Sequence, residues 1–394
     1  MAFQALPGFR DFYPAEMALR RHIERAWHAA AKVAGFSEID GPPLEALDLF
    51  KAKSGEAIVD ELYAFTDKGD REVALRAELT PTLARMAGAK VNALRKPVKW
   101  YSIPQLFRYQ RQQRGRLREH IQWNVDVLGA PDAAAEAEIV YVALDALQRL
   151  GLTKDDVYVR VSHRGPIQRR MTELGFDGEK AEAVLRLVDK EAWDKAAELG
   201  LRRADWLSRD DLVEELAPFS DACRDYGIAD FIEYDPTIVR GLAYYTGMVF
   251  EIFDRKKSMR AIAGGGRYDT LVEKLMGEPL DALGVGMGDV VLGDLLKERG
   301  LAPDEPARLD VLVVPIGEQM IGPSRQVVAH LRRSGQAAEA PYVAVKVGKA
   351  FKLANAAGAA RVVLVGPDEW SAGEVRVKDL ASGAETNVDW RSLS

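Results

Sequence analysis

The residues best suited to chemistry form a cluster of arginines in residues 108–118. Five guanidinium groups fall within these eleven residues, at Arg108, Arg111, Arg114, Arg116 and Arg118. A guanidinium presents several N–H donors in one plane, so it binds phosphate through paired, charge-assisted hydrogen bonds. The cluster therefore indicates a site for a polyphosphate or a nucleic-acid backbone. A solvated hairpin tip that protects a sheet edge would show the same charges, and this interpretation stays open.

Polar residues at strand ends form a second candidate. Gln122, Asn124 and Asp126 alternate with apolar residues, so they would share one face of a strand, because successive side chains of a strand point to opposite sides. Glu78 and Thr80 follow a shorter strand pattern in the same way. A wholly polar strand face contacts either solvent or a polar ligand, and both interpretations are open.

Two glycine-containing segments could also approach a ligand. The three successive glycines of residues 264–266 permit positive φ and a close backbone approach, although a tight hairpin turn is the simpler interpretation. The G-x-G-x-x-G spacing of a dinucleotide-binding loop is not present in them. In RGLAYYTG, Arg240 precedes Tyr244 and Tyr245. A buried arginine there would need an anionic partner, whereas a surface arginine beside aromatic core residues would not.

Composition excludes several classes of protein. The 394 residues predict two or three domains, and 47% hydrophobic with 29% charged residues is typical of a globular chain. The single cysteine, Cys223, excludes an intrachain disulfide and a Cys-rich zinc site, and the five histidines show no metal-ligand spacing. A lone cysteine favours a reducing compartment, so we expect a cytoplasmic protein. No apolar stretch approaches the roughly 18 residues of a membrane span, so no membrane partner is expected.

The net charge is −6, from 54 Lys and Arg against 60 Asp and Glu. As a whole-chain total it argues against a nucleic-acid partner, since phosphate binding grows with the number of cationic contacts. Local clustering can override such a total.

Apolar periodicity predicts the elements that position these residues. Residues 15–34 and 132–150 predict amphipathic helices, the second with Asp132 as its N-cap. ELYAFTD, EVALR, PVKWYSI, PQLFRYQ and HIQWNVDVLG predict strands, and so does DVYVRVSH after the second helix. Because the first five follow one another without a helix between each pair, we expect an antiparallel sheet.

The pattern changes twice further along the chain. Residues 165 to about 228 consist of short, charged helical segments and predict a helical insertion, after which FIEYD and residues 248–253 predict strands. The segment GLAPDEP at residues 300–306 predicts a domain linker. Beyond it, a strand, helix, helix, strand order predicts a small α/β domain with a partly parallel sheet.

Taken together, these segments resemble the histidyl-tRNA synthetases, which are class II aminoacyl-tRNA synthetases. GFRDFYP, LRAELTPTLARM, FRYQRQQRGRLREHIQWNVDVLG, RGLAYYTGMVFE and AGGGRYDTLV occur in the family's order and span nearly the whole chain. The resemblance implies an α+β catalytic domain with an antiparallel sheet at residues 1–164 and 231–300. It also implies a helical insertion at 165–230, an α/β anticodon-binding domain at 308–394, and a homodimer.

The resemblance implies chemistry as well. Such an enzyme activates histidine with ATP and Mg²⁺ to give histidyl-adenylate, and transfers the histidyl group to the 3′ end of histidine tRNA. Arg108 and Arg240 would act on the α-phosphate, Arg116 would also bind ATP, and Gln113 would meet the tRNA acceptor end. Fixed cations stabilise the negative charge that gathers at this phosphorus. The implied histidine-binding residues are Glu78, Thr80 and Gln122 around the α-ammonium, Asp126 and Tyr245 around the imidazole, and Tyr268.

Motif 3 departs from the family pattern. Where the family reads Gly-Leu-Glu-Arg, this chain reads Gly288-Asp289-Val290-Val291. The arginine that would contact ATP is thus replaced by Val291, which fits an apolar helix face. The departure favours an alternative, the synthetase-like regulatory subunit of ATP phosphoribosyltransferase, which binds histidine without charging tRNA. The arginine cluster, Gln113 and the C-terminal domain favour the synthetase.

Overall fold

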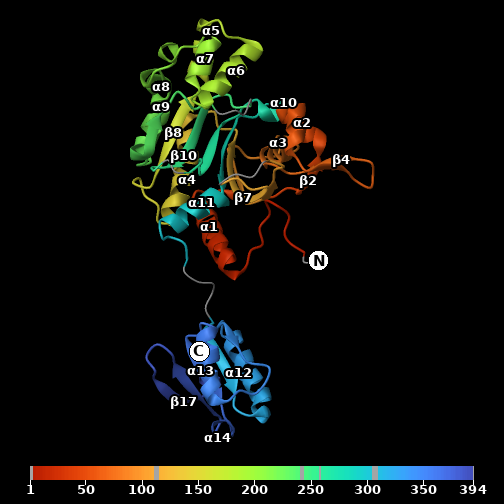
Figure 1. Cartoon of the computed structure of the whole chain (residues 1–394), viewed down its shortest axis with the longest axis vertical. Coiled ribbons are helices and arrows are strands. Elements are labelled where there is room, and N and C mark those ends of the chain that lie inside the picture. The colour runs from red at the N-terminus through yellow and green to blue at the C-terminus, as the bar shows by residue number, and fades with distance from the viewer. Residues whose placement is uncertain (1–2, 111–114, 240–243, 257–258, 304–308, 394) are drawn as a thin grey trace. The chain divides into compact units, whose positions relative to one another are not determined.

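The computed structural model describes residues 3–110, 115–239, 244–256, 259–303 and 309–393. Gln113 and Arg240 lie outside the described residues. The chain divides into two compact units, Met1–Pro303 and Asp304–Ser394, and each is described by itself (Figure 1). No helix in the described ranges is both long and apolar enough to cross a membrane.

The first unit is built on a nine-stranded sheet, counted over its described residues, with the strand order β1-β5-β7-β12-β11-β10-β8-β9 and β6 paired to β7. Its inner pairs are antiparallel, and the outer strands β1 and β9 pair in parallel with their neighbours. The predicted antiparallel sheet is therefore confirmed, with a parallel pair at each edge. The strands are β1 (Ser37–Glu38), β5 (Val98–Ser102), β6 (Gln105–Phe107), β7 (Glu119–Leu128), β8 (Val157–His163), β9 (Ile232–Tyr234), β10 (Met248–Asp254), β11 (Ala263–Arg267) and β12 (Ala282–Gly288).

One face of this sheet carries the main hydrophobic core. It is covered by α1 (Pro14–Val33), α4 (Ala133–Arg149) and α11 (Asp289–Glu298). Trp27 of α1 stacks on Trp123 of β7 with 6.1 Å between ring centroids, and both rings are fully buried. The side chain of Asp132 accepts a hydrogen bond from the Ala134 N–H, which confirms the predicted N-cap.

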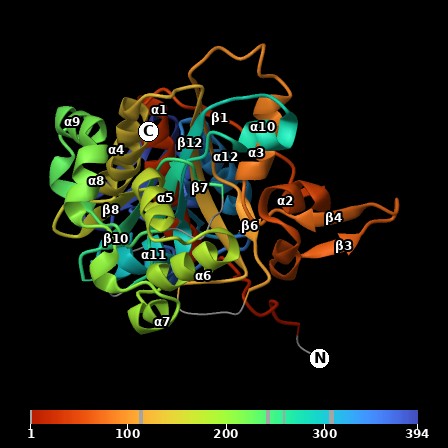
Figure 2. The ribbon, with the colours of Figure 1, turned by 90° about the horizontal axis from the view of Figure 1, so that it is seen from above.

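A smaller sheet lies beside the large one. It has the order β2-β4-β3, formed by Leu44–Ala46, Glu72–Leu75 and Ala64–Thr66. Two of the five successive strands thus belong to this separate sheet rather than to the large one. Figure 2 shows α2 (Leu47–Ser54), α3 (Thr80–Gly88) and α10 (Leu271–Met276) close together on this side.

Helices occupy most of the region between β8 and β9, as the sequence predicts. They are α5 (Arg164–Glu173), α6 (Gly178–Asp189), α7 (Trp193–Glu198), α8 (Arg209–Glu215) and α9 (Ala217–Asp225). Side chains of α5 and α6 share a small separate core around Ile167 and Val184. Leu212 of α8 and Phe219 of α9 instead belong to the main core.

The second unit is an α/β sheet of order β14-β13-β15-β16-β17. β13 pairs in parallel with β14 and β15, and β16 is antiparallel to β15 and to β17. The predicted strands, helices and partly parallel sheet are confirmed, whereas the sequence analysis missed the final hairpin. The elements are β13 (Val311–Pro315), α12 (Ile321–Arg333), β14 (Ala338–Glu339), α13 (Val347–Ala356), β15 (Arg361–Val365), α14 (Pro367–Ser371), β16 (Glu374–Asp379) and β17 (Glu385–Asp389).

Candidate active site

A cleft of about 960 Å³ opens in the first unit on the face of β7 opposite the main core. It brings together every predicted site residue that lies in the described part of the chain. These are Glu78, Thr80, Arg108, Arg116, Gln122, Asp126, Tyr245 and Tyr268.

The floor of the cleft is the polar face of β7. Gln122 donates from Nε2 to Asn124 Oδ1 at 3.0 Å, and His120 Nε2 lies 3.4 Å from Gln122 Oε1. The alternation of polar and apolar residues therefore indicated the correct face. His120 was missed, although it continues the same period of two. Burial, followed by the positive charge of Arg108, lowers the pKa of His120 to about 3, so this imidazole is neutral at physiological pH.

Glycines of the neighbouring strand make room for these polar side chains. In the register of β12 with β7, Gly284 lies opposite Asp126. A Cβ at Gly284 would lie 2.0 Å from Asp126 Oδ1, and one at Gly286 would lie 2.6 Å from Gln122 Nε2. The depth of the cleft thus depends on the missing side chains of β12.

The run of three glycines serves the same purpose in β11. It lies within the sheet, so the predicted hairpin turn is wrong, and these residues do not have positive φ. A Cβ at Gly266 would lie 2.9 Å from two ring atoms of Tyr245, and one at Gly265 would lie 2.2 Å from the Gly284 carbonyl oxygen. The close approach that these glycines allow is therefore between β11 and the neighbouring strand, and between β11 and the Tyr245 ring of the cleft.

The deepest polar group of the cleft is the Asp126 carboxylate. The Tyr268 hydroxyl donates a hydrogen bond to Asp126 Oδ1 at 2.5 Å, and both side chains are buried. Burial raises the pKa of Asp126 to about 7, and the hydrogen bond from Tyr268 opposes this rise. Around this pair, the Tyr244 ring lies edge-on to Tyr268 at 5.7 Å and 4.6 Å from Tyr245, measured between ring centroids. The result is an aromatic pocket with one carboxylate that changes charge near neutral pH.

Glu78 is held in place by a lysine that the sequence analysis missed. Lys53 of α2 forms an ion pair with Glu78 Oε2, and its ammonium lies 4.0 Å from the centroid of the Tyr244 ring. The Lys53 side chain is fully buried, and burial lowers its pKa. Lys53 follows Leu47 and Phe50 at helical spacing on the buried face of α2, and a lysine in that pattern was the available signal.

The arginine cluster contributes to the cleft wall. Arg108 and Arg116 line the cleft, and Arg108 Nε donates to the Ala77 carbonyl oxygen at 2.9 Å. Arg118 instead lies over the ring of Tyr109, 4.5 Å from its centroid. Of the three arginines of the cluster that the structure describes, two therefore line the cleft, which favours anion binding over a purely solvated hairpin tip.

Asp289 of motif 3 has a structural position. Its carboxylate accepts the Ile121 N–H at 2.9 Å and pairs with Arg10 at 2.9 Å, and Arg10 also pairs with Glu119 at 2.7 Å. These contacts attach the start of α11 and the N-terminal segment to β7. Val291 packs in the main core while bordering the cleft, as its place on an apolar helix face predicts.

Magnesium has no ready set of protein ligands here. Within the ranges that the structure describes, His, Cys, Asp and Glu do not form a group of three that could hold a metal. Mg²⁺ usually enters such sites on substrate phosphates, with only one or two carboxylates from the protein. A magnesium ion in this cleft would therefore arrive with a bound polyphosphate.

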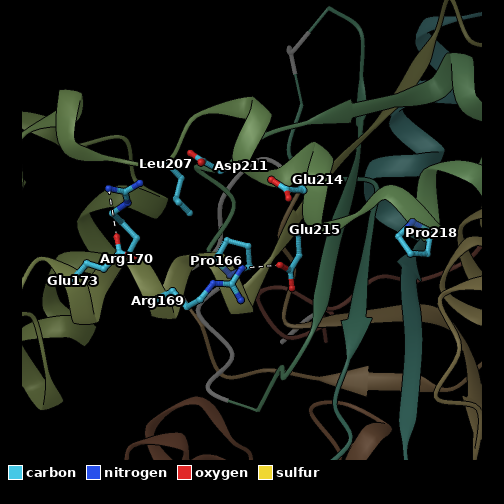
Figure 3. Close-up of a pocket in the computed structure, with 9 residues that line it drawn as sticks. All are labelled: Pro166, Arg169, Arg170, Glu173, Leu207, Asp211, Glu214, Glu215 and Pro218. Carbon is cyan, nitrogen blue, oxygen red and sulfur yellow. Dashed lines mark hydrogen bonds and ion pairs between the residues drawn. The ribbon is translucent and has the colours of Figure 1, made fainter.

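A second, smaller cavity lies away from this chemistry, among α5, α8 and α9, with a volume of about 570 Å³. Figure 3 shows Arg169 reaching Glu215, with which it pairs at 2.6 Å, and Arg170 reaching Glu173. It contains none of the predicted site residues and is not a candidate active site.

Comparison with known proteins agrees with the geometry. A family model described as histidyl-tRNA synthetase matches residues 8–217 and 204–288, and one described as an anticodon binding domain matches residues 310–394. A histidine–tRNA ligase from Opitutus terrae is 43% identical over 418 residues, covering 98% of this chain and 96% of the relative. The chain belongs to the histidyl-tRNA synthetase family.

Solved structures support the same fold. Histidyl-tRNA synthetase from Nostoc sp. PCC 7120 has a TM-score of 0.81 at 22% identity and covers 99% of this chain and 97% of its own. A Bacillus halodurans protein described as an ATP phosphoribosyltransferase regulatory subunit/histidyl-tRNA synthetase has a TM-score of 0.76 at 19% identity, covering 92% of this chain and 98% of its own. At such identities, these similarities show the fold of the histidyl-tRNA synthetase family. The activity has to be argued from the residues of the site.

Proposed function

We propose that this chain is an active histidine–tRNA ligase, which activates histidine with MgATP and transfers it to histidine tRNA. The observation that carries the proposal is that one cleft contains both a polar, aromatic pocket and a group of arginines. Asp126, paired with Tyr268, lies towards the end of β7, whereas Arg108 pairs with Arg118 just before the start of that strand, and Arg116 lines the same cleft. A polar, aromatic pocket beside guanidinium groups suits an amino acid next to a polyphosphate.

The histidine end would work through matched hydrogen-bond partners. Asp126 accepts an imidazole N–H once its carboxylate is ionised, and Tyr245 borders the other side of the ring. Glu78, Thr80 and Gln122 offer acceptors to the α-ammonium, with Lys53 fixing the direction of Glu78. A site that leaves its polar groups unpaired with an apolar analogue rejects that analogue strongly.

The nucleotide end would bind MgATP through Arg108 and Arg116, with Arg240 implied by its motif. As the histidine carboxylate oxygen forms its bond to the α-phosphorus, the bond to the bridging oxygen breaks and pyrophosphate leaves. The guanidinium groups stabilise the added negative charge on the phosphoryl oxygens. Magnesium supplies further charge neutralisation when it arrives with the nucleotide.

The remaining assignments are proposals as well. We propose the domain boundaries given above, with residues 308–394 binding the anticodon and Gln113 meeting the acceptor end. The match of residues 310–394 to an anticodon-binding model supports this use of the second unit. We also propose a cytoplasmic homodimer, in which the buried Cys223, with a pKa raised by burial to about 12, stays unreactive.

Two measurements test the proposed function. Histidine-dependent exchange of pyrophosphate into ATP reports activation, and acylation of histidine tRNA reports transfer; we expect both. Losing a charged hydrogen bond to phosphate costs about 1.5–3 kcal/mol, so Arg108→Ala should slow exchange by roughly tenfold to a hundredfold. Arg186→Ala is the matched control, because Arg186 is 70% exposed and pairs with Glu182 on the surface of α6.

The regulatory-subunit alternative predicts another result. The wild-type chain would then bind histidine but show neither exchange nor acylation, and this outcome would overturn the proposed function.

A further inference from the structure

A further arginine reaches the cleft from the segment that precedes β11. Arg260 borders the cleft together with Arg116, Val290 and Val291. It is distant in sequence from the arginine cluster and does not belong to the motifs that carry the family resemblance.

Gly115 fixes the position of the Arg260 side chain relative to Val291. A Cβ placed at Gly115 would lie 3.2 Å from Val291 Cγ2 and 3.7 Å from Arg260 Cδ. Both side chains therefore meet the same point of the arginine loop. The stem of Arg260 passes beside the position at which motif 3 presents a valine.

Electrostatics places the Arg260 charge close to the other guanidinium groups. Burial lowers the pKa of Arg116, and the positive charges of Arg260 and then Arg108 lower it further. Cations that repel one another in a cleft are stabilised together by an anion that binds between them. A triphosphate carries several negative charges, so it can bind all three guanidinium groups at once.

The backbone that carries Arg260 is anchored next to α11. The Met259 N–H donates to Asp254 Oδ1 at 3.2 Å, and the Ile262 N–H donates to the Ile252 carbonyl oxygen at 2.8 Å. The Gly288 N–H donates to the Ile262 carbonyl oxygen at 3.4 Å, which connects this segment to the first turn of α11. Arg260 thus extends from a fixed strand end.

We propose that Arg260 binds the phosphate groups of ATP and supplies the guanidinium that Val291 does not provide. The inference rests on the proposed function, since it assigns a nucleotide to this end of the cleft. It makes Arg260 part of the ATP site and leaves the histidine pocket around Asp126 unchanged.

Arg260→Met tests the proposal, because methionine keeps much of the apolar stem and removes the charge. We expect the KM for ATP in pyrophosphate exchange to rise about tenfold or more, with the KM for histidine within about twofold of wild type. Lys256→Met is the matched control, as Lys256 is an exposed cation that precedes the same segment and pairs with Glu298. It should leave both KM values unchanged.

A second variant separates charge from structure. Adding Val291→Arg to Arg260→Met returns a guanidinium to the same region from α11, and we expect it to recover at least part of the ATP affinity. Unchanged ATP KM in Arg260→Met, or an equal rise of both KM values with a lowered Tm, would overturn the proposal.

Direct binding of ATP to the wild type and to Arg260→Met, measured by calorimetry, distinguishes this failure from failure of the proposed function. A wild-type chain without exchange activity refutes the function. Equal ATP affinity of the two chains refutes the role of Arg260.

Discussion

Replacing Asp126 with asparagine should stabilise the first unit at alkaline pH and weaken histidine binding. Asp126 is fully buried, and burial raises its pKa from 3.8 to about 7. The folded chain therefore holds a proton that the unfolded chain releases. The contribution of the protonated Asp126 carboxyl group to the free energy of unfolding is fully present below pH 4 and is lost as pH rises towards 7. At 1.36 kcal/mol per pKa unit, the full loss is about 4 kcal/mol.

The pH dependence gives this prediction its magnitude. At pH 5 the unfolded carboxyl group is already mostly ionised, and the loss is only about 2 kcal/mol; at pH 8 it reaches about 4 kcal/mol. Asparagine does not titrate, and its amide oxygen still accepts from Tyr268. The stability difference between Asp126→Asn and wild type should therefore grow by about 2–3 kcal/mol from pH 5 to pH 8.

Urea unfolding followed by tryptophan fluorescence measures this difference. The stacked Trp27 and Trp123 report on the core of the first unit, and the two units are fitted as separate transitions because a multidomain chain does not unfold in one step. Asp155→Asn, which removes a carboxylate from an exposed turn, is the control.

Calorimetry with histidine measures the functional half of the prediction. Asp126→Asn lacks the ionised acceptor, so the affinity should fall about tenfold to a hundredfold above pH 7. A stability difference that stays flat between pH 5 and pH 8, or histidine affinity equal to wild type, would refute this account of Asp126.

Two further substitutions test the cleft floor and a buried ion pair. Gly284→Ala inserts a Cβ 2.0 Å from Asp126 Oδ1, so the KM for histidine in pyrophosphate exchange should rise more than the KM for ATP. Gly322→Ala is the control, because a Cβ there meets nothing within 4 Å. Equal effects of the two substitutions on the KM for histidine would contradict the packing argument. Arg267→Met removes the partner of buried Glu136, which Arg267 Nε contacts at 2.7 Å, and should lower the free energy of unfolding by about 3–5 kcal/mol. Adding Glu136→Gln should restore part of that stability, and an unchanged urea midpoint in the single variant would show that the pair contributes little.

Much of the fold could be predicted because the relevant patterns are local. The alternation in β7 identified both its core face and its cleft face, and Asp132 was recognised as an N-cap from its type and position. Alternation and charge clustering singled out Gln122, Asp126, Arg108 and Arg116, whereas the roles of all eight described site residues came from the family motifs. Their convergence on one cleft depends on strand pairings that a single sequence does not encode in any local pattern.

The parts that sequence analysis missed depend on distant partners. The glycines of β11 read as a turn because their reason for being glycine lies across the sheet, at Tyr245 and at the Gly284 carbonyl oxygen. Lys53 meets Glu78 only after α2 packs beside α3, and Arg260 meets Gly115 only after the sheet has formed. The net charge of −6 also proved a poor guide, because three arginines converge on one cleft while acidic residues are spread over the chain.

The ion pairs of Arg10 also bear on synthesis of the chain by the ribosome. Asp289 lies 279 residues after Arg10, so at roughly 5–20 residues per second it emerges about 14 to 56 seconds later. The glycines of β12 that deepen the cleft emerge only just before Asp289. Once Glu119 has emerged, it is the only one of the two carboxylate partners available to Arg10 until Asp289 follows. Over the same period the cleft lacks β12 beside its floor and α11 at its border. The nascent chain therefore acquires its complete substrate site only when the first unit is almost fully translated.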